Sequence, residues 1–259
     1  MRFQLLAPPV LADAGCYRSD GMLAVRLAAA LAGRGDEAVI AQVEAGDHDV
    51  VVAIGDAARL TGKSNTTRRF AWVGSLAERE RNSFATPLAR SRRLRDALRS
   101  CAPPPHGAVI PAGCDAGLLQ LPLDDARRAV VVVDPRACYV PSVLRGHNVR
   151  QLSSTTPVAW GDAAMREGGI YVHTVPNDSY AYDGPLLDAM AAGMAVVGPA
   201  LGALAEVAVW PNASTNEQAD AEAMKLARSD EYYGNSARRS RVAARQLTWE
   251  RIAERWTRV

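Results

Sequence analysis

The segment GIYVHTVPNDSYAYDGPLLDAMAAGMAVVG (residues 169–198) decides the fold that we predict for this chain. Residues 170–175 form an apolar run rich in strand-forming side chains, and the Pro-Asn-Asp sequence at 176–178 stops it. Residues 194–197 form a second apolar run, which Gly198 closes. We therefore predict two buried strands joined by a loop and a short helix, the repeating unit of an α/β sheet.

The short helix is predicted to begin at Asp183, Gly184 and Pro185, because Asp or Gly suits a cap and proline in the first turn has no N–H to leave unpaired. Gly193 would end the helix. Its apolar side consists of Leu186, Leu187, Met190 and Ala191. Unpaired N–H groups and the helix dipole converge at such an N-terminus, so we expect a phosphate group to bind there.

The rest of the chain continues this alternation of strands and helices. Strands are predicted at residues 3–6, 37–43, 49–54, 69–73, 83–86, 129–133, 149–152 and 158–160. Helices are predicted at residues 21–32, 87–100, 219–229, 233–247 and 248–257. The order predicts an α/β protein with Rossmann-like halves.

Composition limits the partners and the compartment that we expect. The chain has 259 residues, 48% of them hydrophobic and 22% charged, which favours a packed core over disorder. The net charge of +2 argues against nucleic acid as the main partner. The four cysteines and four histidines show no metal-ligand spacing, so we expect no metal and a reducing, cytoplasmic location.

Residues 183–198 resemble the donor-site signature of a large retaining glycosyltransferase family of GT-B architecture, which contains bacterial mannosyltransferases and sucrose synthases. That signature has two glutamates eight residues apart, then Ala-Met-Ala-x-Gly and a Pro-Val-Val strand. Asp188 stands at the second glutamate, which in the family holds the ribose of the nucleotide. Tyr180 stands at the first, which contacts the donor sugar. This chain would be a short and divergent member. The alternative is that the segment is one unit of any doubly wound sheet, with Asp188 a solvated carboxylate.

Other segments resemble the same family. Residues 108–115 are similar to its Val-Ile-Pro-Asn-Gly-Val-Asp segment, and residues 248–253 to its last helix, which crosses back to the first domain. The resemblance implies two Rossmann-like domains that face a central cleft. The acceptor domain would span residues 1–120, and the nucleotide-sugar donor domain residues 121–259.

The resemblance also assigns roles to individual residues. Arg136 follows Asp134 and Pro135 where the family has Gly-Arg and a nearby Lys that grip the diphosphate; either Arg136 is displaced by one position and still binds phosphate, or this clamp is lost. The donor-binding candidates are Gly184, Pro185, Leu186, Leu187, Asp188, Arg136 and Gly202. The catalytic candidates are Asp183, Tyr180 and His173, and the acceptor-binding candidates are Gly15, Asp20 and Gly21. His173 is alternatively a hydrogen-bonded structural residue.

The implied reaction moves a sugar from a nucleotide diphosphate donor, such as a UDP- or GDP-sugar, to a glycan, a lipid-linked or a small-molecule acceptor with retention of configuration, without a metal. The family's histidine near the reaction centre is absent at Gly74. One alternative is therefore a non-catalytic relative that binds a nucleotide or a partner protein. Another is a Rossmann-like enzyme of a different kind, such as an epimerase.

Residues 90–99 contain five arginines and one acidic residue. The ordinary interpretation is a solvated helix face, because leucines at 88, 94 and 98 supply a buried side. One alternative is a patch that binds phosphate, an anionic lipid headgroup or nucleic acid. Another is peripheral contact with the inner face of a membrane.

Overall fold

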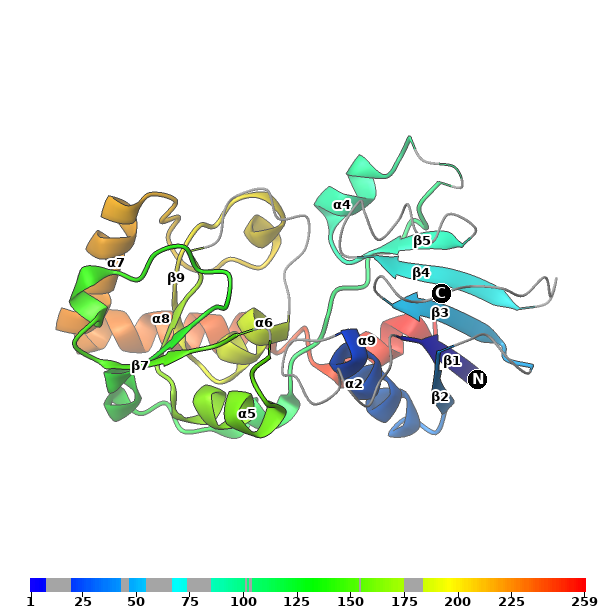
Figure 1. Ribbon diagram of the computed structural model, residues 1–259, viewed down its shortest axis with the longest axis horizontal. Coiled ribbons are helices and arrows are strands. Elements are labelled where there is room, and N and C mark those ends of the chain that lie inside the picture. Colours follow the sequence, from blue (N-terminus) through cyan, green and yellow to red (C-terminus); the bar gives the residue numbers. More distant parts are fainter. Residues whose placement is uncertain are drawn as a thin grey trace. The chain divides into compact units, whose positions relative to one another are not determined.

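The computed structural model describes residues 1–7, 20–42, 47–54, 67–73, 85–100, 102, 104–153, 155–174 and 184–259. These residues form two compact units, each with its own sheet (Figure 1). Unit 1 contains Met1–Ala112 and Trp249–Val259, and unit 2 contains the described residues between them. The last helix therefore belongs to the same unit as the N-terminus.

Unit 1 is built on a parallel sheet of five strands in the order β2-β1-β3-β4-β5. The strands are β1 (Arg2–Leu6), β2 (Glu37–Ala41), β3 (Val50–Ile54), β4 (Arg68–Val73) and β5 (Thr86–Ala89). The central strand β3 is buried at every residue, because elements pack on both faces of a parallel sheet. The helices are α2 (Asp20–Ala32), α4 (Arg92–Ala97) and α9 (Trp249–Trp256). Helices α2 and α9 pack against each other.

The predicted helix at residues 87–100 is wrong at its start, because Pro87 to Ala89 belong to strand β5. Pro87 lies opposite Ala71 of β4, on the outermost strand, where a missing N–H is tolerated. The helix begins only after Ser91, whose hydroxyl accepts a hydrogen bond from the Leu94 N–H at 3.0 Å. This side-chain cap sets the boundary between strand and helix.

Unit 2 is built on a parallel sheet of four strands in the order β7-β6-β8-β9. The strands are β6 (Val130–Val133), β7 (Asn148–Gln151), β8 (Ile170–Val172) and β9 (Ala195–Val197). The α-helices are α5 (Val158–Glu167), α6 (Gly184–Ala191), α7 (Asn216–Arg228) and α8 (Asp230–Ala244). The 3-10 helices are η1 (Ala116–Gln120), η2 (Asp125–Ala129), η3 (Ser142–Leu144) and η4 (Gly202–Glu206). The core of this unit joins the inner strands to apolar residues of α7.

The predicted strand at residues 158–160 is wrong, because these residues form the first turn of α5. Gly161 donates its N–H to the Pro157 carbonyl at 2.9 Å, which is a helical hydrogen bond. Gly161, Ala164 and Met165 are the buried residues of α5, and their spacing of three and four is that of one helix face. Burial over the whole segment therefore overrode the strand preference of its first three residues.

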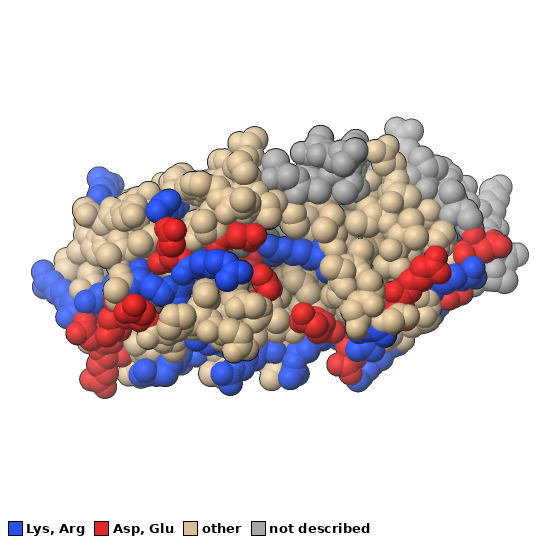
Figure 2. All heavy atoms as spheres, turned by 90° about the horizontal axis from the view of Figure 1, so that it is seen from below, with Lys and Arg blue, Asp and Glu red and all other residues tan. Residues whose placement is uncertain are grey.

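The other predicted elements within the described residues are confirmed to within a few residues at their ends. The predicted strand at 83–86 lies partly outside the described residues. Lys and Arg side chains are interspersed with Asp and Glu on the face that Figure 2 shows. No helix in the described part of the chain combines the length and the apolar character that crossing a membrane requires.

Candidate functional site

Strand β6 is the point at which the strand order of unit 2 reverses. Its neighbours are β7 on one side and β8 on the other, so the successive connections leave it in opposite directions. In open parallel sheets, ligands bind beyond the carboxyl ends of the strands at such a switch point. The residues that follow β6 and β8 therefore form the candidate site of unit 2.

Asp134 follows β6 directly, and its carboxylate has no exposed surface. Its Oδ2 accepts hydrogen bonds from the Tyr171 hydroxyl at 2.9 Å and from Nδ1 of His173 at 3.0 Å. An ionised carboxylate can only accept, so the proton of the His173 ring lies on Nδ1. In the neutral ring this leaves Nε2 as the acceptor nitrogen.

The other oxygen of Asp134 holds Arg136. Oδ1 accepts from the Arg136 backbone N–H at 2.8 Å and from its Nε at 3.4 Å. Burial by itself raises the pKa of Asp134, but the hydrogen bond from His173 and the charge and N–H of Arg136 outweigh it, and the pKa lies well below its ordinary value. The Arg136 side chain is 32% exposed, so part of a fixed guanidinium faces solvent.

The loop that carries Arg136 is hydrogen-bonded to Thr174, just after the end of β8. Cys138 and Tyr139 donate their N–H groups to the carbonyl and the hydroxyl of Thr174 at 3.0 and 3.1 Å. The Tyr139 hydroxyl then donates to Asp220 of α7 at 2.5 Å. This hydrogen bond raises the pKa of Tyr139 and lowers the pKa of Asp220. The loop is therefore preorganised, which reduces the entropy cost of binding a ligand.

His173 lies where β8 and β9 come close together. Its side chain is 1% exposed, and its ring stacks at an interplanar angle of 19° on that of Tyr171. The backbone N–H of His173 donates to the Val197 carbonyl at 2.8 Å. A Cβ built on Gly198 would lie 2.2 Å from the His173 carbonyl oxygen, so a side chain at residue 198 would push the two strand ends apart.

Helix α6 is buried at every residue. Gly184, Pro185, Leu186 and Leu187 form its first turn, as predicted from the sequence. Gly193 follows the helix with φ at +76°, the conformation that favours glycine at a helix end. Arg127 and Arg241 both donate to the Ala192 carbonyl, at 2.7 and 2.9 Å. Two cations therefore compensate the negative end of this helix.

Asp188, the predicted ribose ligand, projects from α6 and has no exposed surface. Its Oδ1 accepts a hydrogen bond from the Asp115 N–H at 2.9 Å. The alternative of a solvated helix carboxylate is therefore wrong. This carboxylate joins α6 to the segment that leads into η1, and ribose binding by Asp188 stays a prediction.

The structure brings Arg136 and His173 together through a residue that the sequence analysis did not select, Asp134. The signal was the position of an aspartate directly after a four-valine strand, at a carboxyl edge. Gly202 begins η4 with φ at +64°.

Three of the remaining candidate site residues lie outside the described part of the chain. Tyr180 and Asp183 lie outside the described residues, as does Gly15. Asp20 begins α2, and Gly21 is buried within it, in unit 1. Among the described residues, no group of three or more His, Cys, Asp or Glu is arranged to hold a metal ion.

No family model matches the sequence. No curated protein matches it either. Solved structures do match over the whole chain. AviGT4, a glycosyltransferase involved in avilamycin A biosynthesis, has a TM-score of 0.67 and 15% identity, over 100% of this chain and 96% of that one. Sucrose-phosphate synthase from Thermosynechococcus elongatus has a TM-score of 0.66 and 11% identity, over 100% and 98%. HepE from Anabaena, in complex with UDP and glucose, has a TM-score of 0.66 and 12% identity, over 100% and 98%.

These matches show the fold. The chain is an α/β protein with the GT-B fold of glycosyltransferases, as the sequence predicted.

Proposed function

We propose that this protein transfers a sugar from a nucleotide diphosphate donor to an acceptor with retention of configuration. The fold supports this proposal, because the solved structures that share it are glycosyltransferases. The observation that carries it is the fixed Arg136 guanidinium beside buried Asp134 and His173, at the switch point of the unit 2 sheet. A cation held at this edge suits a diphosphate.

In this proposal the donor diphosphate lies against Arg136 and the N-terminus of α6. Both offset the negative charge that grows on the leaving phosphate as the glycosidic bond breaks. Gly202 at the start of η4 lets the backbone approach the same phosphates, and Asp188 holds the ribose. HepE was solved with UDP and glucose, and by analogy the donor of this chain is a UDP-sugar or a related GDP-sugar. No metal is part of the proposal.

The reacting sugar lies near Asp183, Tyr180 and His173. Asp183 and Tyr180 replace the glutamate of the resembled family in holding the sugar hydroxyls. The departing phosphate oxygen takes the proton of the acceptor hydroxyl, so the missing histidine near Gly74 is compatible with transfer. His173 contributes its Nε2, whose orientation Asp134 fixes through Nδ1.

The acceptor binds on unit 1 near Gly15, Asp20 and Gly21 in this proposal, and it is a glycan, a lipid-linked or a small molecule. The protein acts in the cytoplasm, with residues 90–99 as the segment that would touch the inner face of a membrane.

Incubating the protein with a panel of UDP- and GDP-sugars, and measuring the released UDP or GDP, tests this function directly. The expected result is nucleotide release from one donor, which the Arg136→Ala variant reduces and the Arg150→Ala variant does not. Arg150 is a suitable control because its guanidinium pairs with Glu167 on the surface of the same unit. Proton NMR of the first product then shows whether the anomeric configuration is retained.

A non-catalytic, nucleotide-binding relative is the second candidate. It is favoured by the internal partners of the two predicted ligands, since Asp134 pairs with Arg136 and the Asp115 N–H occupies an oxygen of Asp188. In this case UDP or GDP binds saturably while no donor in the panel is consumed.

A further inference from the structure

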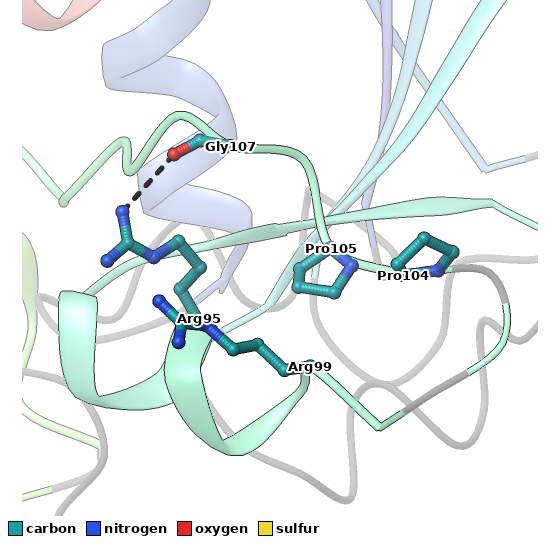
Figure 3. Close-up of a pocket in the computed structure, with 5 residues that line it drawn as sticks. All are labelled: Arg95, Arg99, Pro104, Pro105 and Gly107. Atoms are coloured by element: carbon teal, nitrogen blue, oxygen red, sulfur yellow. Dashed lines mark hydrogen bonds between the residues drawn. The ribbon is translucent and has the colours of Figure 1, made fainter.

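A pocket of about 270 Å³ lies in unit 1, between α4 and the segment that follows it (Figure 3). Arg95, Arg99, Pro104, Pro105 and Gly107 line it. Its volume is at the small end of the range of ligand pockets, so it suits a molecule no larger than one sugar ring with a substituent.

One wall of the pocket consists of Pro104, Pro105 and Gly107, in a segment that hydrogen bonds hold against the sheet. The segment 104–110 runs beside edge strand β5, where the His106 N–H donates to the Pro87 carbonyl at 2.8 Å and the Ile110 N–H donates to the Ala89 carbonyl at 3.1 Å. The two prolines have no N–H groups and present ring carbons. This wall is therefore a fixed apolar surface against which a carbon skeleton can pack.

The opposite wall consists of Arg95 and Arg99 and carries an excess of positive charge. Arg95 and Arg99 each reach the same oxygen of Asp96, at 3.1 and 3.0 Å, so two guanidinium groups share one carboxylate. Figure 3 shows Arg95 extended toward the Gly107 carbonyl, to which its Nη1 donates at 3.3 Å. Arg95 is thus held in position, whereas the Arg99 side chain is 70% exposed and can turn toward a ligand.

The pocket is open beside Gly107. A Cβ built on this residue would meet nothing within 4 Å. A Cβ at residue 107 therefore displaces no protein atoms. Because Gly107 lines the pocket, a large side chain there would occupy part of its space.

We propose that this pocket binds a phosphomonoester, with the phosphate between Arg95 and Arg99 and its carbon substituent on Pro104 and Pro105. A phosphomonoester carries about two negative charges at neutral pH and offers three oxygens to guanidinium groups. It exceeds the single carboxylate of Asp96 in both charge and number of acceptors. This proposal is independent of the donor site in unit 2.

The test is a calorimetric titration of the full chain with glycerol 3-phosphate and with inorganic phosphate at low salt, in the presence of excess UDP. Saturable binding that persists with UDP is expected. Arg99→Ala should raise the Kd about tenfold, the effect of losing one charged hydrogen bond. The control Arg93→Ala, on α4 but outside the pocket, should leave the Kd within about twofold. Asp96→Asn should lower the Kd, because it removes the competing carboxylate.

Gly107→Phe is the steric counterpart, since it blocks the pocket and leaves both arginines in place. It should abolish binding of glycerol 3-phosphate. Equal effects of Arg99→Ala and Arg93→Ala, binding that Gly107→Phe leaves unchanged, or competition by UDP would each overturn the proposal.

A second arm identifies the source of the phosphate. Sedimentation with phosphatidic acid vesicles, compared with phosphatidylcholine vesicles, detects a lipid headgroup if Arg99→Ala and Gly107→Phe both reduce binding. Binding of glycerol 3-phosphate without vesicle binding assigns the pocket to a soluble metabolite.

Discussion

Replacing Asp134 by asparagine removes a buried charge while keeping the size of the side chain. The carboxylate accepts four hydrogen bonds: from the Tyr171 hydroxyl, from Nδ1 of His173, and from the backbone N–H and Nε of Arg136. An asparagine has one acceptor oxygen. Because both Arg136 groups can only donate, we expect this oxygen to face Arg136 and the new NH₂ group to face Tyr171 and His173.

The size of the effect follows from this rearrangement. The Tyr171 hydroxyl can turn to accept, but His173 must move its proton to Nε2, and the two bonds from Arg136 lose the charge on their acceptor. Burying an amide costs less than burying a carboxylate, which offsets part of the loss. We expect the unfolding free energy of unit 2 to fall by about 2 to 4 kcal/mol at pH 7.

Urea unfolding, followed by circular dichroism, measures this loss as a midpoint lower by about 1 to 2 M for a slope of about 2 kcal/mol/M. The matched control is Asp124→Asn, an exposed aspartate of the same unit whose Oδ1 caps η2 through the Ala126 N–H. It should cost no more than about 1 kcal/mol.

The pH dependence gives a second, independent readout. The pKa of Asp134 is lower in the folded than in the unfolded protein, so its contribution is complete above the ordinary aspartate value of 3.8 and is lost as the pH falls below it. The difference between wild type and Asp134→Asn should therefore shrink below about pH 4. A loss under about 0.5 kcal/mol at pH 7, or one that stays constant down to pH 3, would refute this account of the site.

Four further predictions concern the donor site. Arg136→Ala should weaken binding of a nucleoside diphosphate about tenfold and of the nucleoside hardly at all, as measured by calorimetry, because only the phosphates meet the guanidinium; equal effects would remove it from the site. Asp188→Ala should weaken UDP or GDP binding by about 1.5 to 3 kcal/mol, and unchanged affinity in a folded variant would exclude Asp188 as a ribose ligand. Asp183→Ala should lower turnover about tenfold more than Tyr180→Phe, and the reverse order would show that the phenol holds the sugar. Gly198→Ala should lower the free energy of unfolding by at least about 2 kcal/mol in thermal denaturation, because its Cβ would lie 2.2 Å from a backbone oxygen; an unchanged Tm would contradict this steric argument.

The sequence alone determined the elements whose signals are local. The runs of apolar residues predicted strands such as β3 and β6, and the Gly-Pro start and the glycine end predicted α6. Backbone preference, burial pattern and glycine geometry act over a few residues, so they can be read without knowing what the segment packs against. Together they predicted an α/β fold with Rossmann-like halves. The resemblance of residues 183–198 to a glycosyltransferase signature implied the GT-B type, and the structure confirms that fold.

Tertiary structure decided the elements whose local signals were ambiguous. Pro87 suits either the first turn of a helix or an outer strand, and pairing with β4 settled it as a strand. Val158 to Trp160 favour a strand locally, but the buried face of α5 made them a helix.

The site depended on tertiary structure most of all. The partners of Asp134 at Tyr171 and His173 are 37 and 39 residues away in the chain, and Asp115 is 73 residues from Asp188. Only the parallel pairing of β6 with β8 brings the first set to one edge, where Val133 lies opposite Val172. Hydrogen bonds between distant side chains depend on strand register, which no local pattern encodes, and for this reason the sequence selected Arg136 and His173 but not the carboxylate that joins them.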